Sequence, residues 1–326
     1  MNFGSLGIAK ILEEGLMQPA EDLQEATVMA VASREESKAK EFATANSIEK
    51  YYGSYQSLIE DKDIDAVYIP LPNGLHYKWA KKAIEAGKHV LCEKPLCSNG
   101  FEAFSLYELA KEKNLILLDA YHHSFHPSFL RAKEIIHKGE IGEIIEMRGR
   151  FTVNIPKPDI RFDFSLSGGA FMDPGCYLVH ALIHFFDEYP EIISTQVKTD
   201  QDDSRIDIES RAELLIGKKT KVNIHSSIES NEEMKIWLEF FGKEGSLKIN
   251  NFVRSAWGTL QLSNRDTELK EEPFSKRGTF SHQLEEFSKL IKQGPNKQLE
   301  NESKNVMKLL DELYIFSDLP IRGEEI

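Results

Sequence analysis

Cysteine is scarce in this 326-residue chain, which contains only Cys92, Cys97 and Cys176. None of their spacings is C-x-x-C, and none is accompanied by a nearby pair of histidines, so the sequence indicates neither a structural zinc site nor a disulfide framework. We interpret all three as buried, reduced thiols.

Long hydrophobic runs and an excess of positive charge are also missing. The longest apolar stretches, residues 115–118 and 181–186, are far shorter than the ~18 residues that a membrane helix needs, and no secretory leader pattern opens the chain. Lysine and arginine total 40 against 53 acidic residues, giving a net charge of −13, whereas nucleic-acid binding needs a concentrated positive field. We therefore expect a cytoplasmic protein whose partners are neither membranes nor nucleic acids.

The composition is sufficient for two globular domains. Hydrophobic residues make up 41% of the chain, and the length is about twice that of a typical domain of ~150 residues. The pattern changes after Pro127, where alternating strands and helices give way to a series of strands. We predict two domains, an α/β domain at residues 1–122 and an α+β domain at residues 123–326.

Hydrophobic periodicity predicts the fold of each domain. In the first, buried strands are expected at residues 2–6, 27–32, 65–70, 88–92 and 115–120, separated by helices at residues 8–17, 34–46, 75–86 and 99–111. Such alternation indicates an α/β fold with a doubly wound parallel sheet, the Rossmann arrangement. In the second, a helix is expected at residues 128–137, strands at 144–153, 192–197, 211–215, 221–228, 234–241 and 246–249, and closing helices at 279–293 and 301–317. This series predicts a large open sheet, mixed or antiparallel.

The first strand-to-helix turn is the candidate phosphate-binding loop. Gly7 can be the first glycine of a dinucleotide fingerprint, but Ala9 and Leu12 stand where the second and third glycines are expected. An ordinary tight turn is the alternative interpretation. Because a strand precedes the turn and a helix follows it, we assign its backbone to cofactor binding, at Gly7, Ile8, Ala9, Lys10 and Ile11.

A hydroxyl and two cations follow the second predicted strand, at Ser33, Arg34 and Lys38. Folds that prefer NAD place an acidic residue here to bind the ribose hydroxyls, whereas these side chains suit a 2′-phosphate. The alternative is an ordinary N-cap at Ser33 before a solvated helix start, and Glu35 and Glu36 add negative charge. We predict NADP as the preferred cofactor and NAD as the alternative.

Several motifs, in this order along the chain, carry a resemblance to a known family. They are Pro70-Leu71-Pro72-Asn73-Gly74-Leu75-His76, the Glu93-Lys94-Pro95 motif, Ala120-Tyr121-His122-His123-Ser124-Phe125-His126-Pro127, Ile160-Arg161-Phe162-Asp163-Phe164, and residues 168–177. The set resembles the Gfo/Idh/MocA family of NAD(P)-dependent oxidoreductases. The Asp173-x-Gly-x-Tyr177 pattern is most similar to the branch that contains dimeric dihydrodiol dehydrogenase, D-xylose dehydrogenase and glucose-fructose oxidoreductase. The resemblance extends to about residue 190.

The resemblance implies roles for two catalytic side chains. Tyr177 is expected to be the general acid/base, and Lys94 the cation that tunes it and binds the reacting oxygen. An alternative leaves the proton transfer to Lys94 itself. Further cofactor contacts are expected from Glu93, at the nicotinamide ribose, and from Leu71, Pro72, Asn73 and His76.

Substrate contacts are expected from Asp173, Arg161 and His123, although Asp173 would also serve as a helix N-cap and the other two as ordinary surface residues. The chain also offers clustered histidines, namely His122, His123, His126, His180 and His184. We expect no metal there, because the resembling family uses none and the neighbouring phenylalanines suit packed imidazoles.

The resemblance implies a hydride transfer between nicotinamide and a carbinol carbon, either C1 of an aldose, giving a lactone, or a carbon of a trans-dihydrodiol. A non-enzymatic sensor of NAD(P) or sugar is the competing interpretation, against which the retention of Lys94 and Tyr177 argues. A reductase of a non-sugar substrate is a third. The resemblance also implies that residues 1–122 bind the dinucleotide and that the α+β domain, residues 123–326, binds the substrate and dimerises. Its open sheet is expected to form a homodimer or a higher homo-oligomer.

Overall fold

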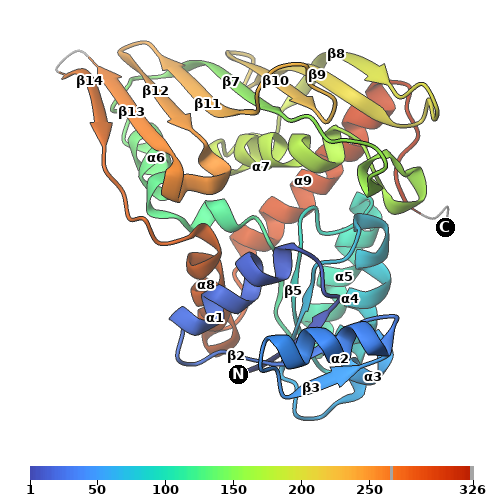
Figure 1. Cartoon of the computed structure of the whole chain (residues 1–326). Coiled ribbons are helices and arrows are strands. Elements are labelled where there is room, and N and C mark those ends of the chain that lie inside the picture. Colours follow the sequence, from blue (N-terminus) through green and yellow to red (C-terminus); the bar gives the residue numbers. More distant parts are fainter. Residues whose placement is uncertain (265–266, 324–326) are drawn as a thin grey trace. The chain divides into compact units, whose positions relative to one another are not determined.

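The computed structural model describes residues 1–264 and 267–323, and the chain divides into two compact units (Figure 1). The first unit comprises residues 1–121 and 280–304, and the second comprises residues 122–279 and the chain from residue 305 onward. The predicted division places residues 280–304 in the second domain, whereas the structure groups them with the first. In the part of the chain that the structure describes, no helix is long and apolar enough to cross a membrane.

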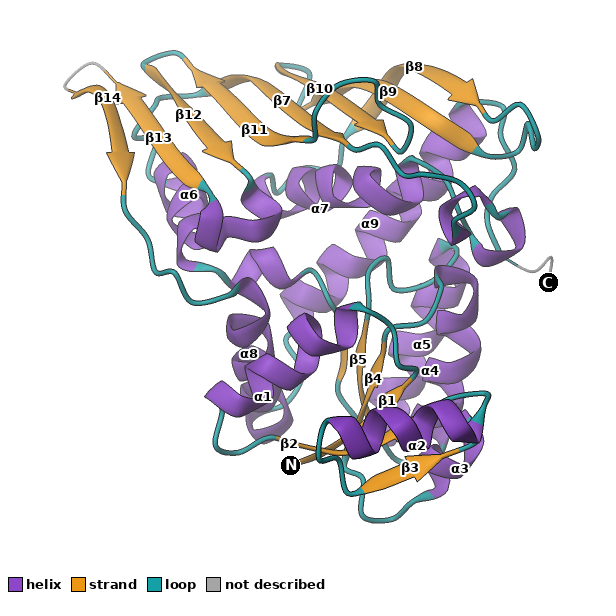
Figure 2. Ribbon diagram, viewed as in Figure 1, coloured by secondary structure: helices purple, strands orange, loops and turns teal. Residues whose placement is uncertain are grey.

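The first unit contains a six-stranded parallel sheet in the order β3-β2-β1-β4-β5-β6 (Figure 2). Its strands are β1 (Asn2–Leu6), β2 (Thr27–Ala32), β3 (Lys50–Tyr52), β4 (Ala66–Ile69), β5 (His89–Cys92) and β6 (Leu117–Asp119). The strand order reverses between β1 and β4, so the predicted doubly wound sheet is confirmed. Strand β3 was not predicted, because a run of three residues is too short to show a period.

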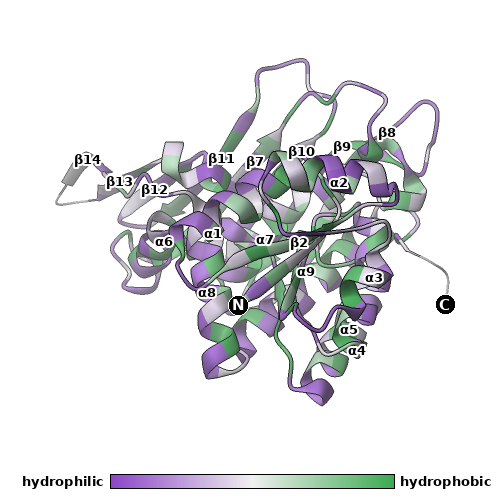
Figure 3. Ribbon diagram, turned by 60° about the horizontal axis from the view of Figure 1, so that its bottom comes forward, coloured by the Kyte–Doolittle hydropathy of each residue, from purple (hydrophilic) through white to green (hydrophobic). Residues whose placement is uncertain are grey.

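Helices pack against this sheet. They are η1 (Glu13–Met17), α1 (Gln18–Asp22), α2 (Glu36–Ala45), α3 (Tyr55–Glu60), η2 (Asn73–Leu75), α4 (His76–Glu85), α5 (Gly100–Lys113), α8 (Thr279–Gln293) and the first part of α9 (Lys297–Phe316). Most carry both hydrophobic and hydrophilic residues (Figure 3). The ring of Phe287 in α8 lies 5.9 Å from that of Phe3 in β1. This core contact explains why residues 280–304 belong to the first unit.

The first helix approaches β4 closely at Gly15. A Cβ atom on this residue would collide with the hydroxyl of Tyr68, which donates a hydrogen bond to Glu93 Oε1 at 2.6 Å. Close helix-to-strand packing is the role of the third glycine in a dinucleotide fingerprint. Gly15 therefore fills that role, whereas Leu12 is a fully buried core residue.

The second unit is built on an eight-stranded sheet in the order β14-β13-β12-β11-β7-β10-β9-β8. Its strands are β7 (Ile144–Thr152), β8 (Glu191–Thr199), β9 (Asp207–Ile216), β10 (Thr220–Ser227), β11 (Lys235–Gly242), β12 (Gly245–Asn250), β13 (Thr259–Asn264) and β14 (Thr267–Glu272). Strands β7 and β10 pair in parallel, and the other neighbours pair antiparallel. The predicted mixed sheet is confirmed, although β13 and β14 were not predicted.

One face of this sheet is covered by helices, with α7 (Cys176–Phe185) running along it (Figure 2). Every residue of α7 is buried, and Phe185 packs edge-on against Phe240 of β11 at 4.8 Å. The other helical segments are η3 (His122–Phe125), α6 (Pro127–His137), η4 (Ile160–Phe162), η5 (Phe164–Leu166), η6 (Phe171–Gly175), η7 (Phe252–Trp257) and the end of α9. A helix that is apolar all round is thus held inside the unit.

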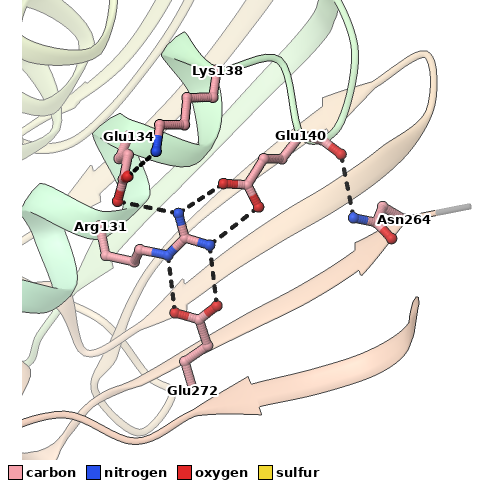
Figure 4. A network of polar contacts seen from close by, with 6 residues as sticks. All are labelled: Arg131, Glu134, Lys138, Glu140, Asn264 and Glu272. Atoms are coloured by element: carbon pink, nitrogen blue, oxygen red, sulfur yellow. Dashed lines mark hydrogen bonds and ion pairs between the residues drawn. The ribbon is translucent and has the colours of Figure 1, made fainter. Parts of the chain in front are cut away.

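Arg131 joins α6 to the edge of the sheet (Figure 4). Its Nη1 donates to Glu140 Oε1 at 2.7 Å, and its Nε donates to Glu272 Oε2 at 3.1 Å. The bond to Glu140 is the largest of the effects that raise the pKa of Arg131, so the guanidinium stays charged. A guanidinium that donates two hydrogen bonds to a carboxylate fixes the relative orientation of the two side chains in addition to pairing their charges.

Asp207, at the start of β9, is a buried junction of the second unit. Its carboxylate accepts hydrogen bonds from the backbone N–H of Phe171 and from the side chains of Ser210, Tyr314 and Arg322. Arg322 is 1% exposed. Its guanidinium also donates to the Gly168 carbonyl at 2.9 Å and stacks on the ring of Tyr314. This junction holds the turn that leads into α7.

We expect Arg322→Met to lower the free energy of unfolding by about 3 kcal/mol, because it leaves a buried carboxylate without its cation. The double variant Asp207→Asn with Arg322→Met should be more stable than Arg322→Met alone. Arg205→Met is the matched control, since its ion pair with Asp203 is exposed and worth under about 1 kcal/mol. Denaturant unfolding measures all three, and equal losses for Arg322→Met and Arg205→Met would contradict the role of the junction.

Candidate active site

The loops after β1 and β4 lie together where the strand order reverses. Gly7 has a φ of +123°, in the left-handed region that side chains rarely adopt, and a Cβ on it would lie 3.2 Å from Leu71 Cδ2. The loop from Ile8 to Ile11 follows, closed by a hydrogen bond from Leu12 N to Ala9 O at 2.9 Å. A bare backbone at this point is what a dinucleotide pyrophosphate requires. The first unit therefore fits such a cofactor.

The predicted 2′-phosphate residues follow β2, at the same edge of the sheet, but they differ in what they contact. The hydroxyl of Ser33 accepts a bond from Glu35 N at 3.3 Å, and Glu35, not Ser33, is the N-cap of α2. Lys38 forms an exposed ion pair with Glu35 at 2.7 Å. Arg34 is exposed, and it makes no ion pair with any residue that the structure describes. Of the two predicted cations, Arg34 is the one whose charge is not already paired.

His76 connects the loop after β4 to the Glu93-Lys94-Pro95 motif. Its Nε2 lies 2.7 Å from the carbonyl oxygen of Leu71, and its Nδ1 lies 3.0 Å from that of Pro95. Burial lowers the pKa of His76 to about 4, and the charge of Lys94 acts in the same direction, against the backbone carbonyls. The imidazole is therefore neutral near pH 7, and its single N–H donates to only one of the two carbonyl oxygens while the ring lies between two loops of the first unit.

Lys94 follows β5 directly, at the carboxyl edge of the sheet, where ligands bind in doubly wound folds. Its side chain is half-buried, whereas Glu93 is buried and accepts the hydrogen bond from Tyr68. Asp119, at the end of the neighbouring strand β6, accepts a bond from Ser303 at 2.8 Å. Burial raises the pKa of Asp119 to about 8, although Ser303 and Lys94 oppose the shift. Asp119 is thus a protonated acid near neutral pH, and sequence reasoning missed it.

Tyr177 lies in the second unit, near the N-terminal end of α7. Its side chain is 7% exposed, and its Oη lies 3.5 Å from His122 Nε2. The ring of His123 lies 5.4 Å from the Tyr177 ring, and the ring of Phe151 lies 5.5 Å from it. His123, predicted as a substrate contact, is itself fully buried. Tyr177 is therefore held by rings from two segments, η3 and β7, so its phenol oxygen is well fixed.

Asp173 and Arg161, predicted as separate substrate contacts, form one ion pair. Arg161 Nε donates to Asp173 Oδ2 at 2.6 Å, and Arg161 Nη1 donates to Asp159 Oδ1 at 3.0 Å. Asp173 provides the largest of the effects that raise the pKa of Arg161. The guanidinium is therefore permanently charged and already balanced. Asp173 lies in the turn η6 that leads to Tyr177, and Arg161 lies in η4, so the pair can present both donors and acceptors to hydroxyl groups.

The clustered histidines of the second unit pack mainly as rings. His123 lies edge-on to Phe129 at 4.8 Å and to His180 at 4.9 Å, and His180 stacks on His184 at 5.7 Å. These contacts agree with the expectation of packed imidazoles. The expected absence of a metal stays a prediction.

Comparisons with known proteins decide the family. Residues 1–121 match the model of an oxidoreductase family with an NAD-binding Rossmann fold, and residues 129–248 match the GFO/IDH/MocA C-terminal domain. The chain belongs to the Gfo/Idh/MocA family. The predicted family is thus confirmed, and with it the assignment of the chain as an oxidoreductase with a nicotinamide dinucleotide cofactor.

Relatives within the Gfo/Idh/MocA family act on sugars and diols. The chain is 32% identical over 320 residues to D-xylose 1-dehydrogenase (NADP(+)) 2 of Haloferax volcanii, covering 96% of each chain. It is 35% identical over 179 residues to a trans-1,2-dihydrobenzene-1,2-diol dehydrogenase of Xenopus tropicalis, which is 55% of this chain and 53% of the relative. A solved structure of a variant of the 3-ketoreductase KijD10 from Actinomadura kijaniata, with TDP-benzene and NADP, matches with a TM-score of 0.89 and 25% identity, over 100% of this chain and 99% of that one.

Asp119 gives this site a testable pH dependence. The folded carboxyl keeps its proton up to about pH 8, whereas the unfolded one releases it near pH ~4. The unfolded state therefore binds fewer protons between these values, and the contribution of Asp119 to the free energy of unfolding falls as the pH rises. Asp119→Asn removes this contribution and retains an oxygen for Ser303.

We expect the stability of Asp119→Asn relative to the wild type to increase between pH 5 and pH 8 by roughly 2–4 kcal/mol. Denaturant unfolding at the two pH values measures it. Glu112→Gln, which removes an exposed carboxylate of α5, is the control and should show no such change. A stability difference that is equal at both pH values would show that Asp119 is ionised in the folded protein.

Proposed function

We propose that the protein is an NADP-dependent dehydrogenase that oxidises a carbinol carbon of a sugar, C1 of an aldose giving a lactone, or of a trans-dihydrodiol. The observation that carries this proposal is the match to D-xylose 1-dehydrogenase (NADP(+)) 2 over nearly the whole length of both chains. The diol dehydrogenase supports the second substrate class over about half of the chain.

The first unit supplies the residues that would hold NADP. The bare backbone at Gly7, with the following residues to Ile11, suits the pyrophosphate. Arg34, exposed at the end of β2, suits the 2′-phosphate, because its charge is not engaged with any carboxylate that the structure describes. Glu93 and the loop from Leu71 to Asn73 would line the nicotinamide half. When bound, NADP+ supplies the acceptor for the hydride.

Two protein side chains act on the reacting oxygen: Tyr177 takes its proton, and Lys94 stabilises its charge. In the oxidation, the substrate O–H bond breaks and its proton passes to Tyr177 Oη, while the C–H electron pair leaves with the hydride. The ammonium of Lys94 stabilises the developing alkoxide and favours the ionised phenol. The half-buried position of Lys94 and the burial of Tyr177 strengthen both effects by limiting exposure to water.

A reduction of a ketone on a nucleotide-linked sugar is the second candidate. The observation that favours it is a 41% identity over 189 residues, 57% of this chain, to dTDP-3,4-didehydro-2,6-dideoxy-alpha-D-glucose 3-reductase of Saccharopolyspora spinosa. We rank it second because Arg161 is already balanced by Asp159 and Asp173, which suits neutral hydroxyls better than a diphosphate.

We also propose a cytoplasmic homodimer in which the open face of the eight-stranded sheet meets its copy. This face carries a hollow of about 420 Å³ lined by side chains that include Arg148, Arg211 and Trp237. Aromatic and arginine side chains are enriched at protein interfaces. An isologous contact would cover the sheet with a single two-fold operation.

The proposed function is tested by titrating the purified protein with NADPH and NADH and then screening aldoses and cyclic diols for turnover. Lys94→Met and Tyr177→Phe should each reduce turnover by roughly 10²–10⁴-fold, because each removes a group that acts on the reacting oxygen, while cofactor affinity stays within about tenfold. Lys113→Met, an exposed cation on α5, is the control. Activity on a dTDP-linked ketone alone would favour the second candidate, and tight binding without turnover would favour a sensor.

The preference for NADP depends on Arg34. Arg34→Ala should weaken NADPH binding by about 10–100-fold, since a hydrogen bond to a charged group is worth ~1.5–3 kcal/mol, and should leave NADH binding almost unchanged. Lys40→Ala, which removes another exposed cation of α2, should affect neither. Fluorescence titration with both cofactors measures the four affinities. Equal losses for NADPH and NADH would exclude Arg34 as the 2′-phosphate ligand.

A further inference from the structure

Tyr177 is linked through a histidine to a residue distant in the sequence. Its Oη lies 3.5 Å from Nε2 of His122, and Nδ1 of the same ring lies 2.6 Å from Oγ1 of Thr279. His122 belongs to the short 3₁₀ turn η3, and Thr279 begins α8, 157 residues further along the chain. Local structure alone does not bring such segments together, so the orientation of His122 is a tertiary feature of the second unit.

The three side chains are almost completely buried, with exposed fractions of 2% for His122, 7% for Tyr177 and 4% for Thr279. A buried imidazole costs free energy unless its nitrogens find hydrogen-bond partners. The short contact to Thr279 fixes the ring at Nδ1, and the ring then directs Nε2 toward the phenol. The longer contact fits a catalytic hydrogen bond without substrate, since such bonds often shorten when the substrate binds.

We propose that His122 is a positioning residue for Tyr177, oriented for this role by Thr279. The Thr279 hydroxyl donates to Nδ1, the imidazole proton is therefore on Nε2, and Nε2–H donates to Tyr177 Oη. A hydrogen bond donated to a phenolate favours the ionised form, so this bond prepares Tyr177 to accept the proton of the substrate hydroxyl. His122 stays neutral throughout and exchanges no proton. The proposal rests on the role of Tyr177 in the proposed function.

Two further imidazoles of the second unit pack around this pair. His123, from the same turn, lies edge-on to His122 at 6.0 Å and contacts the Tyr177 ring, and His180 of α7 packs on His123 at 4.9 Å. Phe151 of β7 also packs against the Tyr177 ring. His122 Nε2 lies 3.5 Å from the phenol oxygen, whereas His123 and Phe151 contact Tyr177 through its ring.

Two substitutions separate the two contacts of His122. An asparagine can place its amide oxygen where Nδ1 accepts from the Thr279 hydroxyl, whereas the amide nitrogen of a glutamine reaches the place of Nε2 and can donate to Tyr177. His122→Asn therefore keeps the link to Thr279 and loses the link to Tyr177, and His122→Gln does the reverse. Thr279→Val removes the hydroxyl that orients the ring at nearly constant volume. His137→Asn, at the exposed end of α6, is the control.

The readout is the pH profile of kcat/KM for oxidation of the substrate found in the screen. In His122→Asn we expect the half-maximal pH to rise by about one unit, a tenfold change in the ionisation constant, with the plateau at high pH retained. His122→Gln should keep the midpoint of the wild type, and Thr279→Val should shift it upward by less than His122→Asn. A rate lowered equally at every pH, or an unchanged midpoint in His122→Asn, would overturn the proposal.

A second measurement does not depend on turnover. The difference in ultraviolet tyrosinate absorbance between each protein and the same protein carrying Tyr177→Phe reports the ionisation of this phenol alone. The upward shift in His122→Asn, and its absence in His122→Gln, should appear here too. If the wild type oxidises no sugar or diol but these shifts are present, the proposed function fails and the positioning role stands. If turnover is found and the shifts are absent, the positioning role fails alone.

Discussion

The second unit depends on the burial of one carboxylate, Asp207. Burial raises its pKa, and the guanidinium of Arg322 opposes that rise, so the two groups are stable inside the protein only when they meet. Their meeting requires the end of the chain, the start of β9 and the turn at Phe171 to close on the same point. That turn continues directly into α7, which carries Tyr177. The position of Tyr177, the proposed acid/base, is therefore set by a junction to which we assign no part in the chemistry.

A different constraint governs the first unit, where burial neutralises the titratable groups around the Glu93-Lys94-Pro95 motif. The pKa of His76 is lowered to about 4 and that of Asp119 is raised to about 8, in both cases chiefly by desolvation. Lys94 lowers both values, yet for Asp119 desolvation outweighs it. Near neutral pH the two buried groups carry no charge, so they can neither neutralise the ammonium nor repel it.

The sequence was sufficient for features that depend on local pattern and insufficient for those that depend on distant contacts. Buried strands alternating with helices predicted the Rossmann sheet, and the motif around Lys94 identified the family. The role of Gly15 was missed because it follows from Tyr68 in another strand. Residues 280–304 were assigned to the second domain because nothing in their pattern reveals the contact between Phe287 and Phe3.

The candidate site shows the same division between what is local and what is not. From residue type alone, Lys38 was predicted to bind the 2′-phosphate, but in the structure it forms an ion pair with Glu35. Residue type also suggested that Arg161 and Asp173 contact the substrate independently. As an ion pair that also includes Asp159, they carry no free positive charge. An anionic substrate would gain little from such a cluster, whereas a polyol can both donate to the carboxylates and accept from the guanidinium. This pairing is the basis on which we propose a neutral sugar or diol rather than a nucleotide-linked substrate, and the two residues considered separately would not support that proposal.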